Sequence, residues 1–230
     1  GVTIYGNSVP EQAAMIRAAE AAGADWVILQ PPTGAYGAAA TIAFFSAVAS
    51  LTELPVAIQN APALMGRGIS GDDIARLVAL QPNITHLKGE MPVLEIDRIV
   101  RDAGDRLTVL NGQGGLEMID SLRAGCQGFV LAPDIADWGV RIWRQWQAGD
   151  VEAAENTYAY ALPAIVFAMR SLEHLLTYGK RIYGLRGSVA IHDRQPALPV
   201  SPAGIAAVTR YAHRLGRFAS GEGGRPTPNQ

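Results

Sequence analysis

A lysine and a glutamate stand two residues apart, Lys88 and Glu90, at the end of a short apolar run. The run, residues 84–87, follows the turn-forming residues 81–83 and predicts a buried strand that ends at the lysine. Side chains two apart on a strand share a face, so the amine and the carboxylate are expected side by side. Burial lowers the pKa of a lysine and makes its amine nucleophilic toward a carbonyl carbon. The alternative is an outward charge that merely ends the strand.

The elements that position this pair alternate regularly along the chain. Short runs rich in Val, Ile and Leu predict six strands, each followed by a helical pattern, at residues 2–5, 26–30, 56–59, 84–87, 107–110 and 129–132. Such alternation predicts an α/β fold with a parallel sheet and helices outside, either an open doubly wound sheet or a (β/α)8 barrel. In both architectures, chemistry takes place at the C-terminal ends of the strands. Those ends carry more polarity than packing requires, with Gln30, Gln59, Lys88, Asn111 and Ala132.

Helix signals support this architecture. Ser8 with Glu11 forms a capping-box pattern, and Ser70 precedes two aspartates that suit the first turn of a helix. The helices are expected at residues 10–22, 41–51, from Ser70 onward, 92–103, 116–124, 135–148, 151–178, 180–186 and 202–218. In the helix at residues 92–103, Leu94, Ile96, Ile99 and Val100 are expected to lie largely on one face. Residues 151–178 are expected to form two helices that meet near Pro163. Residues 60–69 are expected to form a loop.

Composition limits the classes of function. The chain has 230 residues, 49% hydrophobic and 17% charged, with a net charge of −2, so neither nucleic acid nor an anionic membrane is an expected partner. No apolar run reaches about 18 residues and no signal peptide is recognised, which predicts a cytoplasmic protein. Cys126 is the single cysteine and is expected to be a buried structural thiol. The four histidines are scattered, so neither a metal nor a cofactor is expected.

Three segments carry a resemblance to a known family. Residues 54–62, 84–88 and 109–112 resemble the dihydrodipicolinate synthase / N-acetylneuraminate lyase family, and the similarity extends from the opening strand to the last helix. The resemblance implies a (β/α)8 TIM barrel with a C-terminal helical extension, often assembled as a tetramer. It also implies a Schiff base between a strand lysine and a 2-oxo acid such as pyruvate. Lys88 occupies the position of that lysine.

The sequence departs from the family pattern in the residues around the lysine. The tyrosine that relays protons in most members is replaced by Gln59, and an amide cannot transfer a proton as a phenol does. The tyrosine pair of the synthase subgroup is replaced by Pro32 and Thr33. The synthase arginine matches Leu64, and Arg67 lies three residues later. These departures argue against dihydrodipicolinate synthesis.

One branch of the family matches better. Residues 59–62, Gln-Asn-Ala-Pro, are similar to the Gln-Asp-Ala-Pro of the 2-keto-3-deoxy-sugar-acid dehydratases, notably those acting on L-2-keto-3-deoxyarabonate. Residues 88–90 are similar to the Lys-x-Glu of that branch, in which the glutamate is placed to act as a base. The resemblance therefore implies a lyase that dehydrates a 2-keto-3-deoxy sugar acid. A pyruvate-dependent aldolase, a synthase-like condensation and a non-catalytic sugar-acid binder are the alternatives.

The candidate site has a catalytic part and a substrate-binding part. Lys88 is the predicted nucleophile, Glu90 the base, and Gln59 a group that holds the substrate or the leaving water. The predicted substrate-binding residues are Asn60, Pro31, Asn111, Gly112 and Ala132. Each has a structural alternative: Glu90 as a cap of the following helix, Gln59 as a partner of the backbone, and residues 111–112 as a turn. His86 is expected to point outward and to pack.

The expected domain organisation follows from the barrel. Residues 1–149 are predicted to form barrel units three to eight, residues 150–219 the helical extension, and residues 220–230 a disordered tail. A barrel needs eight strands, so the first two units are expected to precede Gly1. The expected partners are a small-molecule 2-oxo acid and other copies of the chain, as a tetramer or dimer.

Overall fold

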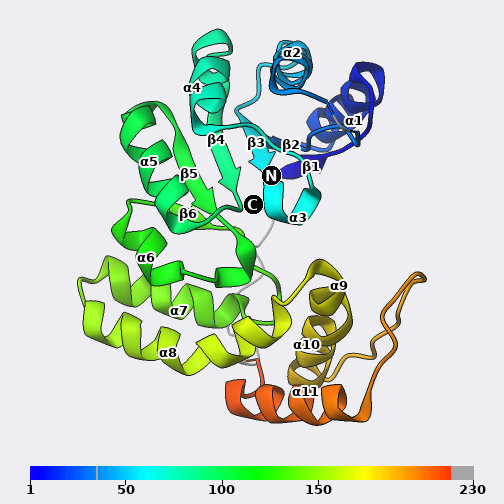
Figure 1. Cartoon of the computed structure of the whole chain (residues 1–230), viewed down its shortest axis with the longest axis vertical. Coiled ribbons are helices and arrows are strands. Elements are labelled where there is room, and N and C mark those ends of the chain that lie inside the picture. The colour runs from blue at the N-terminus through cyan, green and yellow to red at the C-terminus, as the bar shows by residue number, and fades with distance from the viewer. Residues whose placement is uncertain (35, 219–230) are drawn as a thin grey trace, which may run out of the picture. The chain divides into compact units, whose positions relative to one another are not determined.

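The computed structural model describes residues 1–34 and 36–218 (Figure 1). The chain divides into two compact units, residues 1–131 and the residues from Ala132 onward. The boundary predicted at residue 149 separates barrel from extension and stays a prediction. The predicted tail at residues 220–230 lies outside the described residues.

The first unit is built on six parallel strands that pair in the order in which they occur along the chain. The strands are β1 (Val2–Ile4), β2 (Val27–Leu29), β3 (Val56–Asn60), β4 (Ile84–Gly89), β5 (Thr108–Asn111) and β6 (Gly128–Phe129). A doubly wound sheet reverses its strand order at a switch point, whereas a (β/α)8 barrel does not. The sequential order therefore decides between the two architectures in favour of the barrel arrangement.

Helices follow the strands and lie along one side of the sheet (Figure 1). They are α1 (Val9–Ala21), α2 (Ala38–Ala49), α3 (Pro62–Met65), α4 (Gly71–Leu80), α5 (Val93–Ala103) and α6 (Met118–Arg123), with the 3-10 turns η1 (Gly104–Arg106) and η2 (Gln113–Gly115). Both predicted N-terminal signals are confirmed: Ser8 and Glu11 form a capping box on α1, and Ser70 and Asp73 form one on α4. The short helix α3 lies where a loop was predicted.

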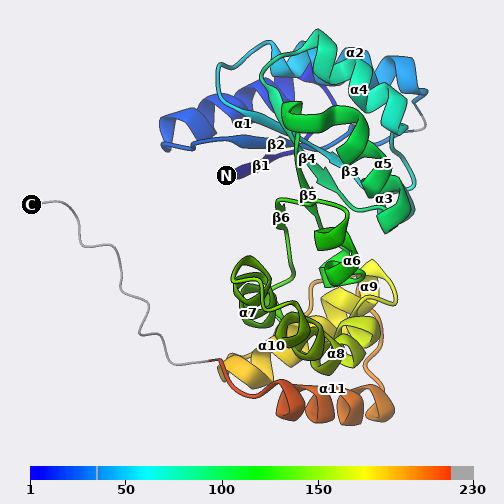
Figure 2. The same cartoon turned by 90° about the vertical axis from the view of Figure 1, so that its left-hand side faces the viewer.

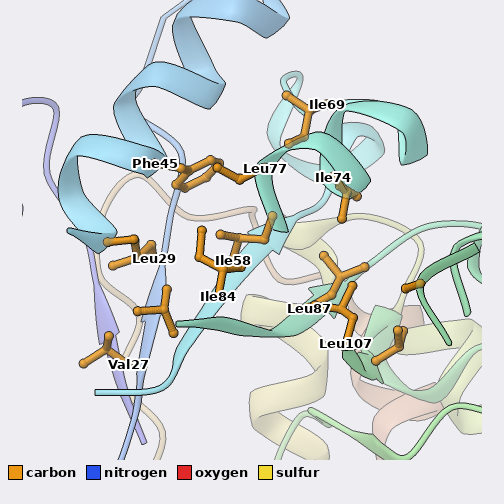
Figure 3. Close-up of a cluster of buried hydrophobic side chains, with 14 of the residues drawn as sticks. Val27, Leu29, Phe45, Ile58, Ile69, Ile74, Leu77, Ile84, Leu87 and Leu107 are labelled. Atoms are coloured by element: carbon orange, nitrogen blue, oxygen red, sulfur yellow. The ribbon is translucent and has the colours of Figure 1, made fainter. Parts of the chain in front are cut away.

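The core lies between the sheet and these helices (Figure 3). Ile58 of β3 and Leu87 of β4 pack with Phe45 of α2 and Leu77 of α4, and all four side chains are buried. Burial of each such side chain contributes about 1.5–3 kcal/mol. Since strand side chains alternate, the neighbours of Ile58 and Leu87, among them Gln59 and Lys88, point to the opposite face of the sheet.

An irregularity in β4 changes which residues share a face. Val56 pairs with Ile84, but the next residue of β3, Ala57, pairs with His86, so one extra residue is accommodated at Thr85. The extra residue lets Ile84 and Leu87 both face the helices. His86 pairs with Ala57 and stands two residues from Lys88, so it lies on the same face as Lys88, and the prediction that it points outward is wrong. Leu94 was predicted to lie largely on one face of α5 with Ile96 and Ile99, but it is 79% exposed whereas those two are buried.

The second unit consists of helices. They are α7 (Ala136–Gln147), α8 (Val151–Ala168), α9 (Leu172–His174), the π-helical turn η3 (Leu175–Gly179), α10 (Lys180–Gly187) and α11 (Pro202–Leu215). Helix α7 packs beside α8, and α10 lies beside α11 (Figure 2). Among the described residues, no helix is long and apolar enough to cross a membrane.

The break predicted at Pro163 is in the wrong place. Helix α8 continues through Pro163 to Ala168, and the next helix begins after the N-cap Ser171. A proline inside a helix removes one backbone hydrogen bond. Buried residues on either side of it, Ala161 and Ala164, keep the helix packed through that gap.

Arg186 of α10, in the second unit, is a buried charged residue that is only 2% exposed. Its guanidinium donates to the backbone carbonyl of Asp134 and to the carboxylate of Asp137, at the start of α7. Its Nε donates to the carbonyl of Gly216, 2.7 Å away, at the end of α11. One buried cation thus satisfies acceptors at the ends of two helices.

Asp134, beside this arginine, is expected to reduce stability at neutral pH. Its side chain is buried, Oδ1 has no hydrogen-bond partner among the described residues, and burial raises the pKa of the carboxyl to about 6. The folded protein therefore holds the proton more tightly than the unfolded chain. Stability is consequently lost as the pH rises from about 4, the ordinary pKa, through about 6.

The substitution Asp134→Asn removes this charge and keeps the shape of the side chain. We expect it to raise the free energy of unfolding at pH 7 by about 1–3 kcal/mol, at about 1.4 kcal/mol per unit of pKa shift. Urea unfolding at pH 5 and pH 7 measures this. The native protein should lose stability between pH 5 and pH 7 and the variant should lose less. Equal pH dependence in the two proteins would contradict the prediction.

Candidate active site

Lys88 and Glu90 lie side by side at the end of β4. Lys88 Nζ is 3.4 Å from Glu90 Oε2, and the two side chains are only 16% and 12% exposed. The backbone N–H of Glu90 donates to the carbonyl of Asn60 at 2.9 Å, so the ladder between β3 and β4 continues past the last strand residue. The extended backbone is what brings the amine and the carboxylate to the same face.

The alternative role of Glu90, as a cap of the following helix, is taken by another residue. The N-cap position of α5 is Pro92, which offers no side-chain hydrogen bond. The first N–H of the helix, on Val93, donates instead to Glu117 Oε2 at 2.9 Å. Glu117 comes from the segment after β5 and has a left-handed backbone, with φ of 55°. The carboxylate of Glu90 is thus free to contact Lys88 and Gln59.

Two glutamines continue the cluster from the neighbouring strands. Gln59 pairs in register with Lys88, and its Nε2 donates to Glu90 Oε2 at 2.6 Å. The Oε1 of Gln59 accepts a hydrogen bond of 2.9 Å from Nε2 of Gln30. These bonds join side chains, so Gln59 does more than satisfy the backbone. Gln30 was noted at a strand end but not predicted as a site residue.

The backbone of Gly112 lies directly against the side chain of Glu90. A Cβ added at this glycine would lie 2.6 Å from Glu90 Cγ and 2.8 Å from Oε1. The N–H of Gly112 donates to the carbonyl of Gly89 at 3.0 Å, which holds the backbone in place. Only a residue without a side chain permits this approach.

Residues 3–213 match the sequence model of the Dihydrodipicolinate synthetase family. The chain belongs to this family. A 4-hydroxy-tetrahydrodipicolinate synthase of Methanococcoides burtonii is 26% identical over 199 residues, which cover 85% of this chain and 67% of the relative. A probable mitochondrial 4-hydroxy-2-oxoglutarate aldolase of Emericella nidulans is 32% identical over 179 residues, which cover 73% of this chain and 57% of that protein.

The fold of this family member also matches a solved structure. YagE, a prophage protein of E. coli K12 solved in complex with pyruvate, superposes with a TM-score of 0.83 at 24% identity, over 93% of this chain and 74% of YagE. The fold is that of the (β/α)8 barrel of the dihydrodipicolinate synthetase family with C-terminal helices. The described residues contribute six strands to that architecture. The chain spans between 57% and 67% of the two sequence relatives it is compared with.

Two residues that were predicted to bind substrate, Asn60 and Asn111, instead form hydrogen bonds with other parts of the protein. The amide of Asn60 donates to the carbonyl of Ile69 at 2.9 Å and accepts from its N–H at 3.0 Å. Asn111 donates to Ser121 Oγ at 2.7 Å and accepts from the N–H of Gly112 at 2.6 Å. Strand alternation places both amides on the helix side of the sheet. They hold loops, and their contacts do not support a direct role in substrate binding.

Pro31 and Ala132 were also predicted to bind substrate. Pro31 is buried directly after Gln30. Ala132 was predicted at the end of the sixth strand, but β6 ends at Phe129 and Ala132 begins the second unit. The placement of that strand end was therefore wrong. Roles of both residues toward a substrate stay predictions.

Two other titratable groups of the first unit, His86 and Cys126, have pKa values that burial shifts. His86 stacks on Trp26 with 5.5 Å between ring centroids, and burial lowers its pKa. Burial raises the pKa of the Cys126 thiol to about 11, and this cysteine lies in the core as predicted. Within residues 1–34 and 36–218, no three His, Cys, Asp or Glu side chains lie close enough together to hold a metal ion.

A substitution at Gly112 tests the close approach to Glu90. In Gly112→Ala the new methyl group displaces the carboxylate, so we expect a turnover about 10²-fold lower, as for a catalytic group misplaced by about 1 Å. Crowding is also expected to cost about 1–3 kcal/mol of stability. The matched control is Gly37→Ala, where nothing lies within 4 Å of the added Cβ. Turnover and urea unfolding of both variants are the measurements. Unchanged turnover in Gly112→Ala would show that the carboxylate position is not needed.

Proposed function

We propose that this chain carries the active site of a lyase that forms an imine between Lys88 and the ketone of a 2-oxo acid. The observation that carries the proposal is the Glu90 carboxylate 3.4 Å from the Lys88 amine in a largely buried site. Imine formation followed by proton abstraction requires a nucleophilic amine and a base beside it. The YagE structure, which holds pyruvate on the same fold, supports a 2-oxo acid as the substrate class.

The reaction proceeds in four steps. The neutral amine of Lys88 attacks C2 of the 2-oxo acid, and the carbinolamine takes up a proton from water and loses a water molecule to give a protonated imine; the final hydrolysis returns that proton. The imine withdraws electrons from C3, so Glu90 takes a proton from C3 and an enamine forms. The enamine expels the C4 hydroxyl, which leaves as water with the proton that Glu90 returns. Hydrolysis of the conjugated imine frees the unsaturated product and regenerates the amine.

Dehydration of a 2-keto-3-deoxy sugar acid is the reaction that these residues suit best. Its decisive step removes a proton from carbon, which is the work of a carboxylate such as Glu90. Gln59 stands where most family members have a proton-relaying tyrosine, and an amide holds an oxygen by hydrogen bonds without exchanging a proton. A synthase-like condensation, which uses that tyrosine, is correspondingly less suited to the site.

Retro-aldol cleavage by the same imine is the second candidate. The observation that favours it is the relative named as a probable 4-hydroxy-2-oxoglutarate aldolase, at 32% identity. Cleavage between C3 and C4 requires a base for the C4 hydroxyl. In that case Glu90, and not Gln59, would have to take the hydroxyl proton.

Borohydride trapping and product analysis test the proposal together. Reduction in the presence of pyruvate should add a stable adduct to Lys88, and absence of an adduct with every 2-oxo acid tried would indicate a non-catalytic binder. With a panel of 2-keto-3-deoxy sugar acids, loss of water without carbon–carbon cleavage supports the dehydratase. Release of pyruvate and an aldehyde overturns it in favour of the aldolase.

We also propose that the protein acts as a homo-oligomer, a tetramer or a dimer, because of its membership of the dihydrodipicolinate synthetase family. Sedimentation velocity at micromolar concentration measures this. A single species with the mass of one chain would overturn the proposal without affecting the imine chemistry.

A further inference from the structure

We infer that Gln30 is a positioning residue that fixes which end of the Gln59 amide faces Glu90. The inference rests on the proposed function and deepens it, because it concerns how the base is held. Gln30 Nε2 lies 2.9 Å from Gln59 Oε1, and Gln59 Nε2 lies 2.6 Å from Glu90 Oε2. The three side chains come from the ends of three consecutive segments, β2, β3 and β4.

The polarity of this row follows from hydrogen-bond chemistry. An ionised carboxylate only accepts hydrogen bonds, so Gln59 must turn its NH2 group toward Glu90. The carbonyl of Gln59 then faces away and requires a donor, which Gln30 supplies. A flip of the Gln59 amide would set its carbonyl against the carboxylate and its NH2 against the NH2 of Gln30. Gln30 and Glu90 therefore hold the amide from both sides.

Hydrogen bonds to the backbone of Gln30 fix the position of this residue. Its carbonyl accepts a 2.9 Å hydrogen bond from Nε2 of Gln12, and the same nitrogen donates to the carbonyl of Gly6 at 3.0 Å. Gln12 is fully buried on α1. The N–H of Gln30 donates to the carbonyl of Ile4 at 2.9 Å. A continuous row thus runs from α1 to the Lys88 amine, and the Gln30 side chain within it is attached to a fixed backbone.

Two consequences follow for the reaction. Gln59 donates to Glu90 Oε2, and this hydrogen bond holds the carboxylate that accepts the C3 proton at a fixed place beside Lys88. In addition, the NH2 group of Gln59 carries a second N–H besides the one that Glu90 accepts. That N–H can donate to a substrate oxygen, such as a carboxylate or the oxygen of a departing hydroxyl.

The substitution Gln30→Glu tests the inference because it replaces the donor by an acceptor of the same shape. Gln59 then lies between two carboxylates and can satisfy only one of them. We expect the acidic limb of the pH–rate profile to move upward by about one pH unit. We also expect the thermal midpoint at pH 7 to fall by about 3–6 °C. Gln30→Met, which removes the donor without adding a charge, should move the pH–rate limb less.

A second background separates positioning from general structure. In Glu90→Gln the residue at position 90 both donates and accepts, so the whole row can reverse its polarity. The fall in thermal midpoint caused by Gln30→Glu should therefore largely disappear in the double variant Gln30→Glu, Glu90→Gln. An equal fall in both backgrounds, or a pH–rate limb that stays in place in Gln30→Glu, would overturn the inference.

The thermal cycle also distinguishes this inference from the proposed function, because it needs no substrate. If borohydride yields no adduct on Lys88 while the coupling between positions 30 and 90 is present, the imine proposal fails and the amide row stands. If the adduct forms and the coupling is absent, Gln30 loses its positioning role and the imine proposal stands.

Discussion

Replacement of Lys88 by methionine is expected to abolish the borohydride adduct and to lower turnover by about 10⁴-fold or more. Methionine approximates the length of the lysine stem but offers no nucleophile, so under the proposed function it removes the group that forms the covalent intermediate. Intact-mass and peptide-mass measurements after reduction with pyruvate detect the adduct directly.

The sequence supplies a matched control for this experiment. It contains two lysines, Lys88 and Lys180. Lys180 donates a hydrogen bond of 2.8 Å to the carbonyl of His192 and lies in the second unit. Lys180→Met should therefore keep both the adduct and the turnover. An adduct that survives in Lys88→Met and vanishes in Lys180→Met would overturn the assignment of the nucleophile.

The second large effect is expected at Glu90. Glu90→Gln should still form the trapped imine with pyruvate, while turnover falls by about 10²–10⁴-fold, the range typical for loss of a general base. The amide fills the same space and still reaches Gln59, so the site keeps its shape. Exchange of the C3 protons of pyruvate with deuterated water, followed by NMR, isolates the step that the base performs.

Glu117→Gln is the matched control, because it neutralises another glutamate of the same unit, one that caps helix α5. It weakens the cap of α5, where Glu117 accepts from Val93, so a loss of about 0.5–1 kcal/mol of stability is expected. The C3 exchange rate should stay within a few-fold of the native value. Native-like exchange in Glu90→Gln would remove Glu90 from the mechanism, and a steep loss in Glu117→Gln would show that exchange reports on loop integrity instead.

Local rules predicted the parts of the fold that depend on neighbouring residues. The capping boxes at Ser8 and Ser70 depend on residues three apart, and the shared face of Lys88 and Glu90 depends on residues two apart. The same alternation puts Asn60 on the face of Ile58, so its position on the core side was within reach of the sequence. The prediction that His86 points outward contradicts this rule, because His86 stands two residues from Lys88.

The rest depends on contacts that no local pattern encodes. Glu117 caps α5 from 24 residues further along the chain, and Gln30 reaches Gln59 across 29 residues. The extra residue accommodated at Thr85 appears only when β4 is set against β3. Helix α8 keeps Pro163 because buried alanines surround it, which is a property of the packing and not of the proline.

The sequential order of the strands also bears on how the site is assembled during folding. Each strand bonds to the one next to it along the chain, so the closing of each contact orders only a short stretch of backbone and costs little loop entropy. The side chains of the row come from the ends of β2, β3 and β4, and the backbone of Gln30 is held by Ile4 of β1. The geometry of the row is therefore expected to need the first four strands and not the last, β6.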